Sequence, residues 1–232
     1  MNSVWLQNAG IIAASRAVKK NRRVYLSISQ LLNILLCIPF IPPLLIVMVI
    51  IAIAIKLDSP GPVFFVQERV GRYGRRFKMY KFRTYSHNHD PQADKAFMKA
   101  YISGKASTYD EPTRPRYKPN NEAQITRMGR LLRKTSLDET PQILNILRGQ
   151  MSLIGPRPNI PWEVETYQLW HTERLDVLPG ITGLAQVKGR SNLCFDELVR
   201  YDIHYVRNQS LILDLRILWW TVLTVFTGQG AG

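Results

Sequence analysis

One long uncharged stretch limits what this chain can fold into. Residues 24–55 contain no charged side chain, which is long enough to indicate a helix that crosses a membrane. Pro39, Pro42 and Pro43 interrupt its middle, and a proline inside a helix removes a backbone donor and clashes with the preceding turn. The sequence therefore predicts an apolar element that is broken at the prolines.

The lengths of the two pieces and the charges around them distinguish two membrane topologies. At 1.5 Å per residue, residues 24–38 and 44–55 would extend about 22 Å and 18 Å, against about 30 Å of hydrocarbon. Basic clusters flank both ends, at residues 16–23 and 69–83, and the positive-inside tendency prefers both on the cytoplasmic side. We therefore predict a re-entrant hairpin over 24–56, with a kinked spanning helix as the alternative.

The two ends of the chain are also interpreted in relation to a membrane surface. Residues 1–23 form an N-terminal extension, either an in-plane helix or a disordered lead-in. Their charges follow the apolar positions instead of preceding them, which excludes a secretory signal. Residues 214–227 are apolar, too short to span and carry Trp219 and Trp220, which suit the headgroup zone. We predict an interfacial helix there, with a buried core helix as the competing interpretation.

The charge balance implies an anionic partner. The chain has 31 Lys and Arg against 17 Asp and Glu, a formal net charge of +14, which favours nucleic acid, a phosphorylated small molecule or an acidic membrane surface. No recognition-helix or RNA-binding signature is present, so no nucleic-acid partner is expected. The two cysteines do not have a metal-ligand spacing, which fits a reducing, cytosol-facing location.

The remaining chain, residues 57–232, is expected to form a catalytic domain of the α+β class that is mostly helical. Two alternating runs around a glycine-rich turn, 63–70 and 77–85, predict a small β-hairpin. Residues 86–124 are polar and proline-punctuated, which is typical of a long functional loop, with a short helical pattern near 92–102. Further helices are expected at 161–178 and 195–208.

Adjacent carboxylates at Asp138 and Glu139 open an apolar helical pattern that runs through Leu147. Ser136 and Glu139 also fit a capping box, in which a hydroxyl and a glutamate satisfy free amides at a helix start, and on spacing alone this structural interpretation is favoured. Pro141 is better tolerated if the helix starts at Asp138. Either start places Asp138 near a positive helix end, where an ionised carboxylate can bind a cation or attack phosphorus.

Cations surround this carboxylate pair in the sequence. Arg133 lies just before it, and Arg157 follows a Gly-Pro turn that we expect to be rigid. A second glycine-rich turn, residues 178–190, ends at Arg190. Ordinary loop geometry explains such turns, but two arginine-bearing turns beside a carboxylate pair favour a phosphate cradle.

Five ordered blocks give the chain a specific resemblance. They read SPGPVFFVQERVG, FKMYKFRT, GRLLRKTSLDETPQILNILRGQMSLIGPRP, LPGITGLAQVKGR and YDIHYVRNQSLILDLRIL. Together they resemble the bacterial sugar transferase family, the monotopic phosphoglycosyl transferases. The similarity runs from about residue 24 to near the C-terminus.

The resemblance implies transfer of a phosphosugar from a UDP-sugar to polyprenol (undecaprenyl) phosphate at the bacterial inner membrane, with release of UMP. It implies Mg²⁺ at an Asp-Glu pair, here Asp138 and Glu139, with Asp138 as a covalent nucleophile. Phosphate binding would fall to four cations that match the family's basic positions: Arg133, Arg157, Arg190 and Lys81. A direct displacement without a covalent intermediate is the enzymatic alternative. A basic membrane protein that binds anionic lipid or nucleic acid is the non-enzymatic one, and a homodimer is left open.

Overall fold

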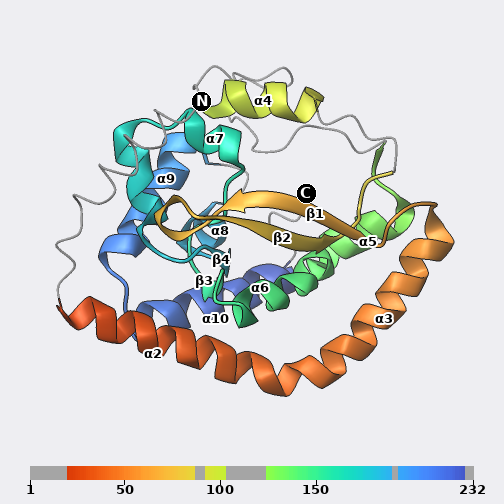
Figure 1. Ribbon diagram of the computed structural model, residues 1–232, viewed down its shortest axis with the longest axis horizontal. Coiled ribbons are helices and arrows are strands. Elements are labelled where there is room, and N and C mark those ends of the chain that lie inside the picture. The colour runs from red at the N-terminus through yellow and green to blue at the C-terminus, as the bar shows by residue number, and fades with distance from the viewer. Residues whose placement is uncertain (1–19, 87–91, 103–123, 190–192, 228–232) are drawn as a thin grey trace.

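The structure is a computed structural model that describes residues 20–86, 92–102, 124–189 and 193–227 (Figure 1). Most of the predicted N-terminal extension, most of the 86–124 loop and Arg190 therefore lie outside the described residues. Within the described part, helices predominate over two small two-stranded sheets. This agrees with a mostly helical α+β class.

The uncharged stretch folds into two helices joined by a short 3₁₀ turn. Helix α2 spans Lys20–Cys37, the turn η1 spans Ile38–Phe40, and helix α3 spans Ile41–Asp58. Pro42 and Pro43 lie in the first turn of α3, where the missing N–H groups would have no helical acceptor. The break therefore falls at η1, which contains Pro39, and the two prolines that follow it are part of the second helix.

Each of these helices has 18 residues and so is about 27 Å long at 1.5 Å per residue. Both helices are longer than the predicted pieces, 24–38 and 44–55. Helix α2 begins four residues earlier, at Lys20, and α3 includes Pro42 and Pro43 and continues to Asp58. Figure 1 shows α2 and α3 as a wide V, with the other labelled helices and strands on its concave side. The start of α2 and the end of α3 therefore lie on the same side of the bend.

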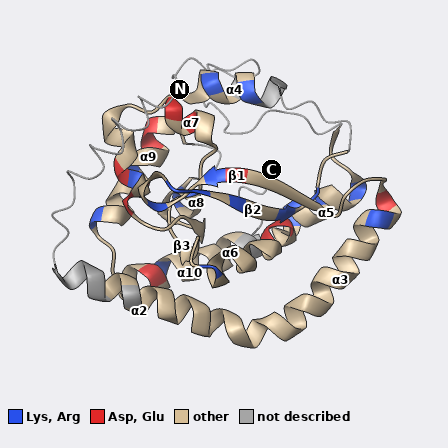
Figure 2. Ribbon diagram, in the orientation of Figure 1, with Lys and Arg blue, Asp and Glu red and all other residues tan. Residues whose placement is uncertain are grey.

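The surface of this V is apolar. Among the described residues, one helical segment, Ile28–Asp58, is long and apolar enough to cross a membrane, and little of it is buried against the protein. Figure 2 shows its ribbon free of charged residues until the end of α3, where Lys56 and Asp58 lie. Leu57 is 84% exposed and Phe40, in the bend, is 66% exposed. Such a continuous apolar surface marks an interaction site for a membrane or a partner.

The predicted β-hairpin is confirmed. Strand β1, Phe64–Val70, pairs antiparallel with β2, Arg76–Phe82, and a short turn η2, Arg72–Gly74, joins them. Tyr73 and Gly74 both have positive φ in this turn, which accommodates the tight reversal of the chain. On β2 the side chains of Phe77, Met79 and Lys81 share one face, because successive residues of a strand alternate.

A second sheet was not predicted. Strand β3, Ser152–Ile154, pairs with β4, Gly180–Thr182, and the two are parallel. Between them the chain forms α7, Pro161–Glu165, and the 3₁₀ helix η5, Leu169–Asp176. The continuous helix predicted over 161–178 is therefore wrong, and Gln168 interrupts it with an extended backbone.

The other helices surround these sheets. Helix α4 spans Gln92–Ile102, α5 Arg127–Thr135, α6 Ile143–Leu147, α8 Leu184–Lys188, α9 Phe195–Arg207 and α10 Leu211–Thr227, while a 3₁₀ helix, η4, covers Leu137–Gln142. The helical patterns expected near 92–102 and 195–208 are confirmed. Helix α10 begins three residues before the predicted Asp214, and it has two different faces. Its Ile217 is fully buried and its Trp219 is 62% exposed.

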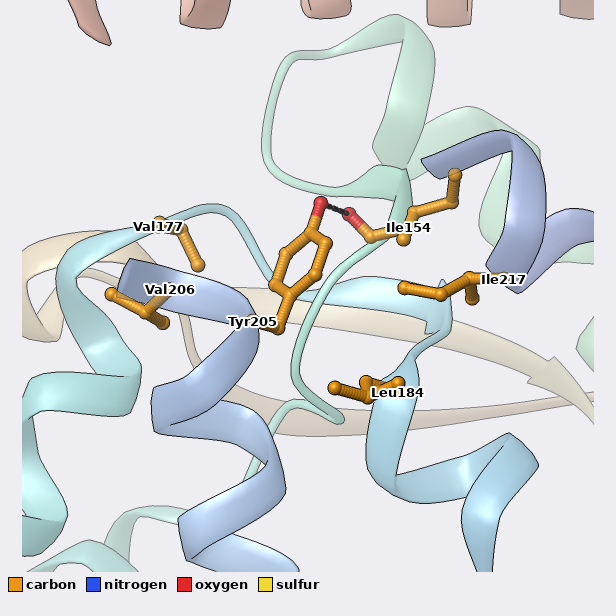
Figure 3. Close-up of a cluster of buried hydrophobic side chains, with 6 residues drawn as sticks. All are labelled: Ile154, Val177, Leu184, Tyr205, Val206 and Ile217. Carbon is orange, nitrogen blue, oxygen red and sulfur yellow. Dashed lines mark hydrogen bonds between the residues drawn. The ribbon is translucent and has the colours of Figure 1, made fainter. Parts of the chain in front are cut away.

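The largest described core joins the second sheet to the last two helices. Figure 3 shows Ile154 of β3, Leu184 of α8, Tyr205 of α9 and Ile217 of α10 converging on one buried cluster, which Val177 and Val206 complete. Burial of each such side chain contributes about 1.5–3 kcal/mol relative to leaving it exposed. The C-terminal helix is thus a structural part of the domain on one face, and only its other face remains available to a membrane.

A buried polar network fastens the first helix to this core. The Tyr25 hydroxyl of α2 donates to one oxygen of Asp214 at 2.6 Å, and the Tyr205 hydroxyl donates to the other at 2.9 Å. Farther along α2, Asn33 donates to the Ser152 hydroxyl at 2.8 Å. These contacts tie α2 to α9, α10 and β3, so the V and the domain form one packed unit.

A buried ion pair holds η5 against α9. The Arg174 guanidinium donates to Asp202 and to the Tyr167 hydroxyl at 2.9 Å, and the side chains of Arg174 and Asp202 are almost completely buried. Burial raises the pKa of Asp202 to about 6 although the Arg174 charge lowers it. The raised pKa means that desolvation of the Asp202 carboxylate outweighs its attraction to the Arg174 cation.

We therefore expect Arg174→Met to destabilise the fold by about 3–5 kcal/mol, because it leaves a buried carboxylate without its cation. The double variant Arg174→Met, Asp202→Leu removes both charges and should recover most of that loss. Thermal unfolding in detergent micelles, followed by tryptophan fluorescence, measures both variants. A double variant that is less stable than Arg174→Met would contradict this account.

Candidate active site

The carboxylate pair lies on a 3₁₀ helix rather than at the start of an α-helix. Helix α5 ends at Thr135, and the next residue, Ser136, adopts a left-handed backbone with φ of 57° and makes no side-chain capping hydrogen bond. The capping-box interpretation of Ser136 and Glu139 is therefore wrong. After Ser136 the chain enters η4, with Asp138 and Glu139 in its first turn and Pro141 inside it, and it becomes α-helical only at Ile143.

Glu139 is held between two cations from different elements. The Lys81 Nζ atom on β2 is 2.6 Å from Glu139 Oε1, and Arg157, which follows β3, places a guanidinium nitrogen 3.6 Å from the same oxygen. The Lys81 and Glu139 side chains are 14% and 19% exposed. An ion pair with this little solvent is screened far less than a surface pair, so it determines how β2 and η4 lie relative to each other.

Asp138 is partly buried beside the same charges. Burial raises the pKa of the Asp138 carboxyl, the positive charge of Lys81 is the largest effect that lowers it, and the charge of Glu139 raises it again. Arg133 and Arg157 lower it further. Burial lowers the pKa of Lys81, and the charge of Glu139 opposes that change. The site therefore depends on mutual neutralisation of closely spaced charges.

The segment just after strand β2 positions the Arg133 side chain. Its guanidinium lies over the Tyr85 ring, 4.3 Å from the ring centre, and its Nε donates to the Thr84 hydroxyl at 3.1 Å. Helix α5 can approach this closely because Gly129 has no side chain. A Cβ atom there would lie only 2.1 Å from the Thr84 carbonyl oxygen. The glycine therefore brings Arg133 to the site.

Arg157 is positioned by the parallel sheet. The Gly155 amide donates to the Thr182 carbonyl at 2.8 Å, and the Gly180 amide donates to the Pro156 carbonyl at 2.9 Å. A Cβ atom on Gly155 would lie 2.3 Å from the Leu178 carbonyl oxygen. The rigid Gly-Pro turn predicted from the sequence is thus anchored by backbone pairing with the second glycine-rich segment.

A fully buried carboxamide aligns β2 with the helices that follow η4. Asn145 of α6 donates to the Lys78 carbonyl at 2.7 Å and accepts from the Tyr80 amide at 3.3 Å, the pattern that a residue of a neighbouring parallel strand would make. Its amide also donates to Gln150 at 2.8 Å. Asn145 therefore pairs with β2 on the edge away from β1, one residue before Lys81.

A small cavity lies beside Glu139. It is lined by Lys81 and Met79 of β2, by Glu139 and Gln142 of η4, by Arg157 and Pro158, and by Gly180, Ile181 and Gln186. Gln142 and Gln186 were not among the predicted site residues. Gln142 could have been found from its spacing, because residues three apart share one face of a 3₁₀ helix, but that spacing matters only once η4 is known to be 3₁₀.

The structure brings most of the predicted site residues together. Lys81 and Arg157 contact Glu139, and Lys81, Arg133 and Arg157 all act electrostatically on Asp138. Arg190 lies outside the described residues. Lys81 was predicted to bind phosphate, and in the structure its ammonium group pairs with Glu139. Among the described residues no group of three or more His, Cys, Asp or Glu side chains is arranged to hold a metal ion.

Comparison with known proteins decides the family. The model of the bacterial sugar transferase family matches residues 24–228. The chain belongs to this family. The match begins in α2 and includes every site residue described above. The family therefore includes both the V of α2 and α3 and the carboxylate site.

Relatives of known name extend over different lengths. The exopolysaccharide production protein ExoY of Sinorhizobium fredii is 37% identical over 88% of this chain and 86% of its own. The UDP-N-acetylgalactosamine-undecaprenyl-phosphate N-acetylgalactosaminephosphotransferase of Aeromonas hydrophila is 34% identical over 90% of this chain and 46% of its own. The undecaprenyl-phosphate galactose phosphotransferase of Salmonella typhimurium is 39% identical over 74% of this chain and 35% of its own. The chain thus spans less than half the length of the last two.

Proposed function

We propose that this sugar transferase moves a sugar-1-phosphate from a UDP-sugar to polyprenol phosphate, most simply undecaprenyl phosphate, and releases UMP. Two relatives are named as sugar phosphotransferases that use undecaprenyl phosphate, one for N-acetylgalactosamine and one for galactose. The observation that carries the proposal is the convergence of Lys81, Arg133 and Arg157 on the adjacent carboxylates Asp138 and Glu139. A carboxylate pair surrounded by cations suits a reaction in which both substrates are phosphate anions.

The proposed reaction has two displacements at one phosphorus atom. A carboxylate oxygen of Asp138 attacks the β-phosphorus of the UDP-sugar, the bond from that phosphorus to the bridging oxygen breaks, and UMP leaves with the electron pair. A phosphate oxygen of the polyprenol phosphate then attacks the same phosphorus and releases Asp138. A covalent intermediate means that nucleotide and lipid need not occupy the site together. Lys81, Arg133 and Arg157 would stabilise negative charge on the transferring phosphoryl group.

We propose Mg²⁺ as the cofactor, held by Asp138 and Glu139 together with substrate phosphates. The two carboxylates fit this ion because Mg²⁺ in phosphate-transfer sites commonly takes only one or two protein carboxylates and completes its shell with water and phosphate oxygens. Burial raises the pKa of Asp138, and a nearby dication would favour its ionised form. When bound, Mg²⁺ supplies charge neutralisation between the carboxylates and the diphosphate. Lys81 must then release Glu139, with which it pairs at 2.6 Å.

We also propose that the V of α2 and α3 is a re-entrant anchor in the inner membrane and that the domain faces the cytoplasm. Its support is the apolar exposed surface of both helices and the position of the domain on the concave side of the bend (Figure 1). The exposed face of α10, with Ile212, Leu215 and Trp219, would rest on the same membrane surface. The site would then lie near the height of the lipid phosphate.

Protease accessibility tests this topology. We expect epitope tags at both termini to be protected from external protease in right-side-out spheroplasts and to be cleaved once the spheroplasts are permeabilised. The reason is that a re-entrant element leaves the membrane on the face where it entered. Cleavage of the N-terminal tag alone in intact spheroplasts would support the kinked spanning helix instead.

Radiolabelled UDP-sugar turnover tests the reaction. We expect the wild type to release UMP from at least one sugar in a panel of UDP-sugars and to form a labelled polyprenyl diphosphosugar. Asp138→Asn should lose at least about a thousandfold in rate, because the loss of a nucleophile removes the covalent route. Asp196→Asn, which changes an exposed carboxylate of α9, is the matched control and should retain activity.

Mass spectrometry of the intact protein, mixed with UDP-sugar but no lipid, should locate a phosphosugar on Asp138. An active wild type without this adduct would favour direct displacement in a ternary complex. Equal activity of Asp138→Asn and wild type would exclude the nucleophile. A wild type that turns over none of the UDP-sugars would favour the non-enzymatic lipid-binding alternative.

The pH dependence of the rate tests the electrostatics of the site. The ionised form of Asp138 is the nucleophile, so activity should be lost as pH falls through its raised pKa. Lys81→Met removes the largest charge that lowers this pKa, so we expect the acid limb of the rate profile to move to higher pH. Lys78→Met, an exposed lysine on the opposite face of β2, should leave the limb in place. An unmoved or lower limb in Lys81→Met would contradict the assignment.

A further inference from the structure

Gln142 is a buried polar side chain without a hydrogen-bond partner among the described residues. Its exposed fraction is 2%, and it lines the same cavity as Lys81, Glu139 and Arg157. A side chain in the wall of a charged cavity can contact a molecule that enters it, and a free amide there can form hydrogen bonds with that molecule.

The backbone explains why this side chain faces the cavity. Residues Leu137–Gln142 form a 3₁₀ helix, which has three residues per turn, so side chains three positions apart eclipse each other. Glu139 and Gln142 therefore share one face of η4, and this face is turned toward Lys81 and Arg157. An α-helix would have rotated Gln142 away from Glu139 by a fraction of a turn.

A neighbouring carboxamide shows the contrast within one short segment. Asn145, three residues later, is equally buried but makes hydrogen bonds to the Lys78 carbonyl, the Tyr80 amide and Gln150. The Asn145 carboxamide therefore has a structural role, because its hydrogen bonds are all made within the protein. Gln142 has the same functional group and a comparable degree of burial, and no such contacts hold it.

The other walls of the cavity suggest what Gln142 binds. Lys81 and Arg157 carry two positive charges against the single negative charge of Glu139, so the cavity favours an anion. Gln186 is a second carboxamide in the lining, and its Nε2 donates to the Ile181 carbonyl at 2.9 Å. The amide of Gln142 thus offers uncommitted N–H donors to an anionic oxygen beside the two cations.

We propose that Gln142 is a further substrate-contacting residue, whose side-chain amide donates a hydrogen bond to a non-bridging oxygen of the diphosphate of the nucleotide sugar. This inference rests on the proposed function, because it takes the diphosphate as the anion that enters the cavity. Gln142 would orient the phosphoryl group beside Asp138 without taking part in bond making. It would also act on every UDP-sugar alike, because the diphosphate is common to all of them.

Gln142→Met is the variant that tests the proposal, because methionine has a similar length and no polar atoms. We expect its melting temperature to equal or exceed that of the wild type, since no internal hydrogen bond is lost. We expect kcat/KM for UMP release to fall about ten- to hundredfold, the loss that one hydrogen bond to a charged group implies. The effect should be similar for every UDP-sugar that the wild type accepts.

Asn145→Leu is the matched control, because it replaces a buried carboxamide that is fully hydrogen-bonded. It should lower the melting temperature, whereas Gln142→Met should not. A Gln142→Met variant that keeps full activity, or one that loses stability as Asn145→Leu does, would overturn the proposal.

A binding measurement separates this proposal from the proposed function. The full chain in detergent is titrated with UDP and with inorganic pyrophosphate in the presence of Mg²⁺, and binding is followed by calorimetry. Weaker binding of both probes to Gln142→Met than to the wild type supports the contact, even if the wild type transfers no sugar and the proposed function fails. Equal binding by the two proteins, or no binding by the wild type, overturns it.

Discussion

The ion pair between Lys81 and Glu139 is the interaction on which the rest of the site depends. It connects strand β2 to the 3₁₀ helix η4 across 58 positions of sequence, with the two charged atoms 2.6 Å apart. Because little water reaches it, the pair is strong and its geometry is restrictive. Arg157 joins it from the parallel sheet, and Asp138 is partly buried next to it. The charged groups of the candidate site are therefore also the contacts that join its elements.

This arrangement places two demands on the surrounding structure. The strand must be held in register with η4, and Asn145 does this by pairing with the free edge of β2. The arginines must approach through crowded backbone, and Gly129 and Gly155 leave the space for that. The V of α2 and α3 is packed onto the same framework through Tyr25, whose hydroxyl reaches Asp214. An anchor joined this rigidly to the domain would hold the site at a constant height relative to a membrane surface.

The errors of sequence interpretation have a common cause. A capping box and an α-helical start at Asp138 agree with local spacing, yet Ser136 turns left-handed at the end of α5 and η4 follows. A single helix over 161–178 agrees with periodicity, yet the chain breaks at Gln168, and Arg174 beyond the break donates to Asp202 on α9 and back to Tyr167. In both places a contact with a distant element overrides local preference, and such a contact leaves no signal in a short window.

Sequence by itself determined the broken apolar element, the β-hairpin and the helix of α9, and it singled out four residues that the structure brings together, Asp138, Glu139, Arg133 and Arg157. These follow from proline positions, from alternation and from charges that lie close together along the chain, all of which are local properties. Tertiary structure decided that Lys81 pairs with Glu139, that β3 and β4 are parallel, and that Gln142 faces the charged cavity. The physical reason is that these features depend on groups far apart in the chain, and only packing determines which of them meet.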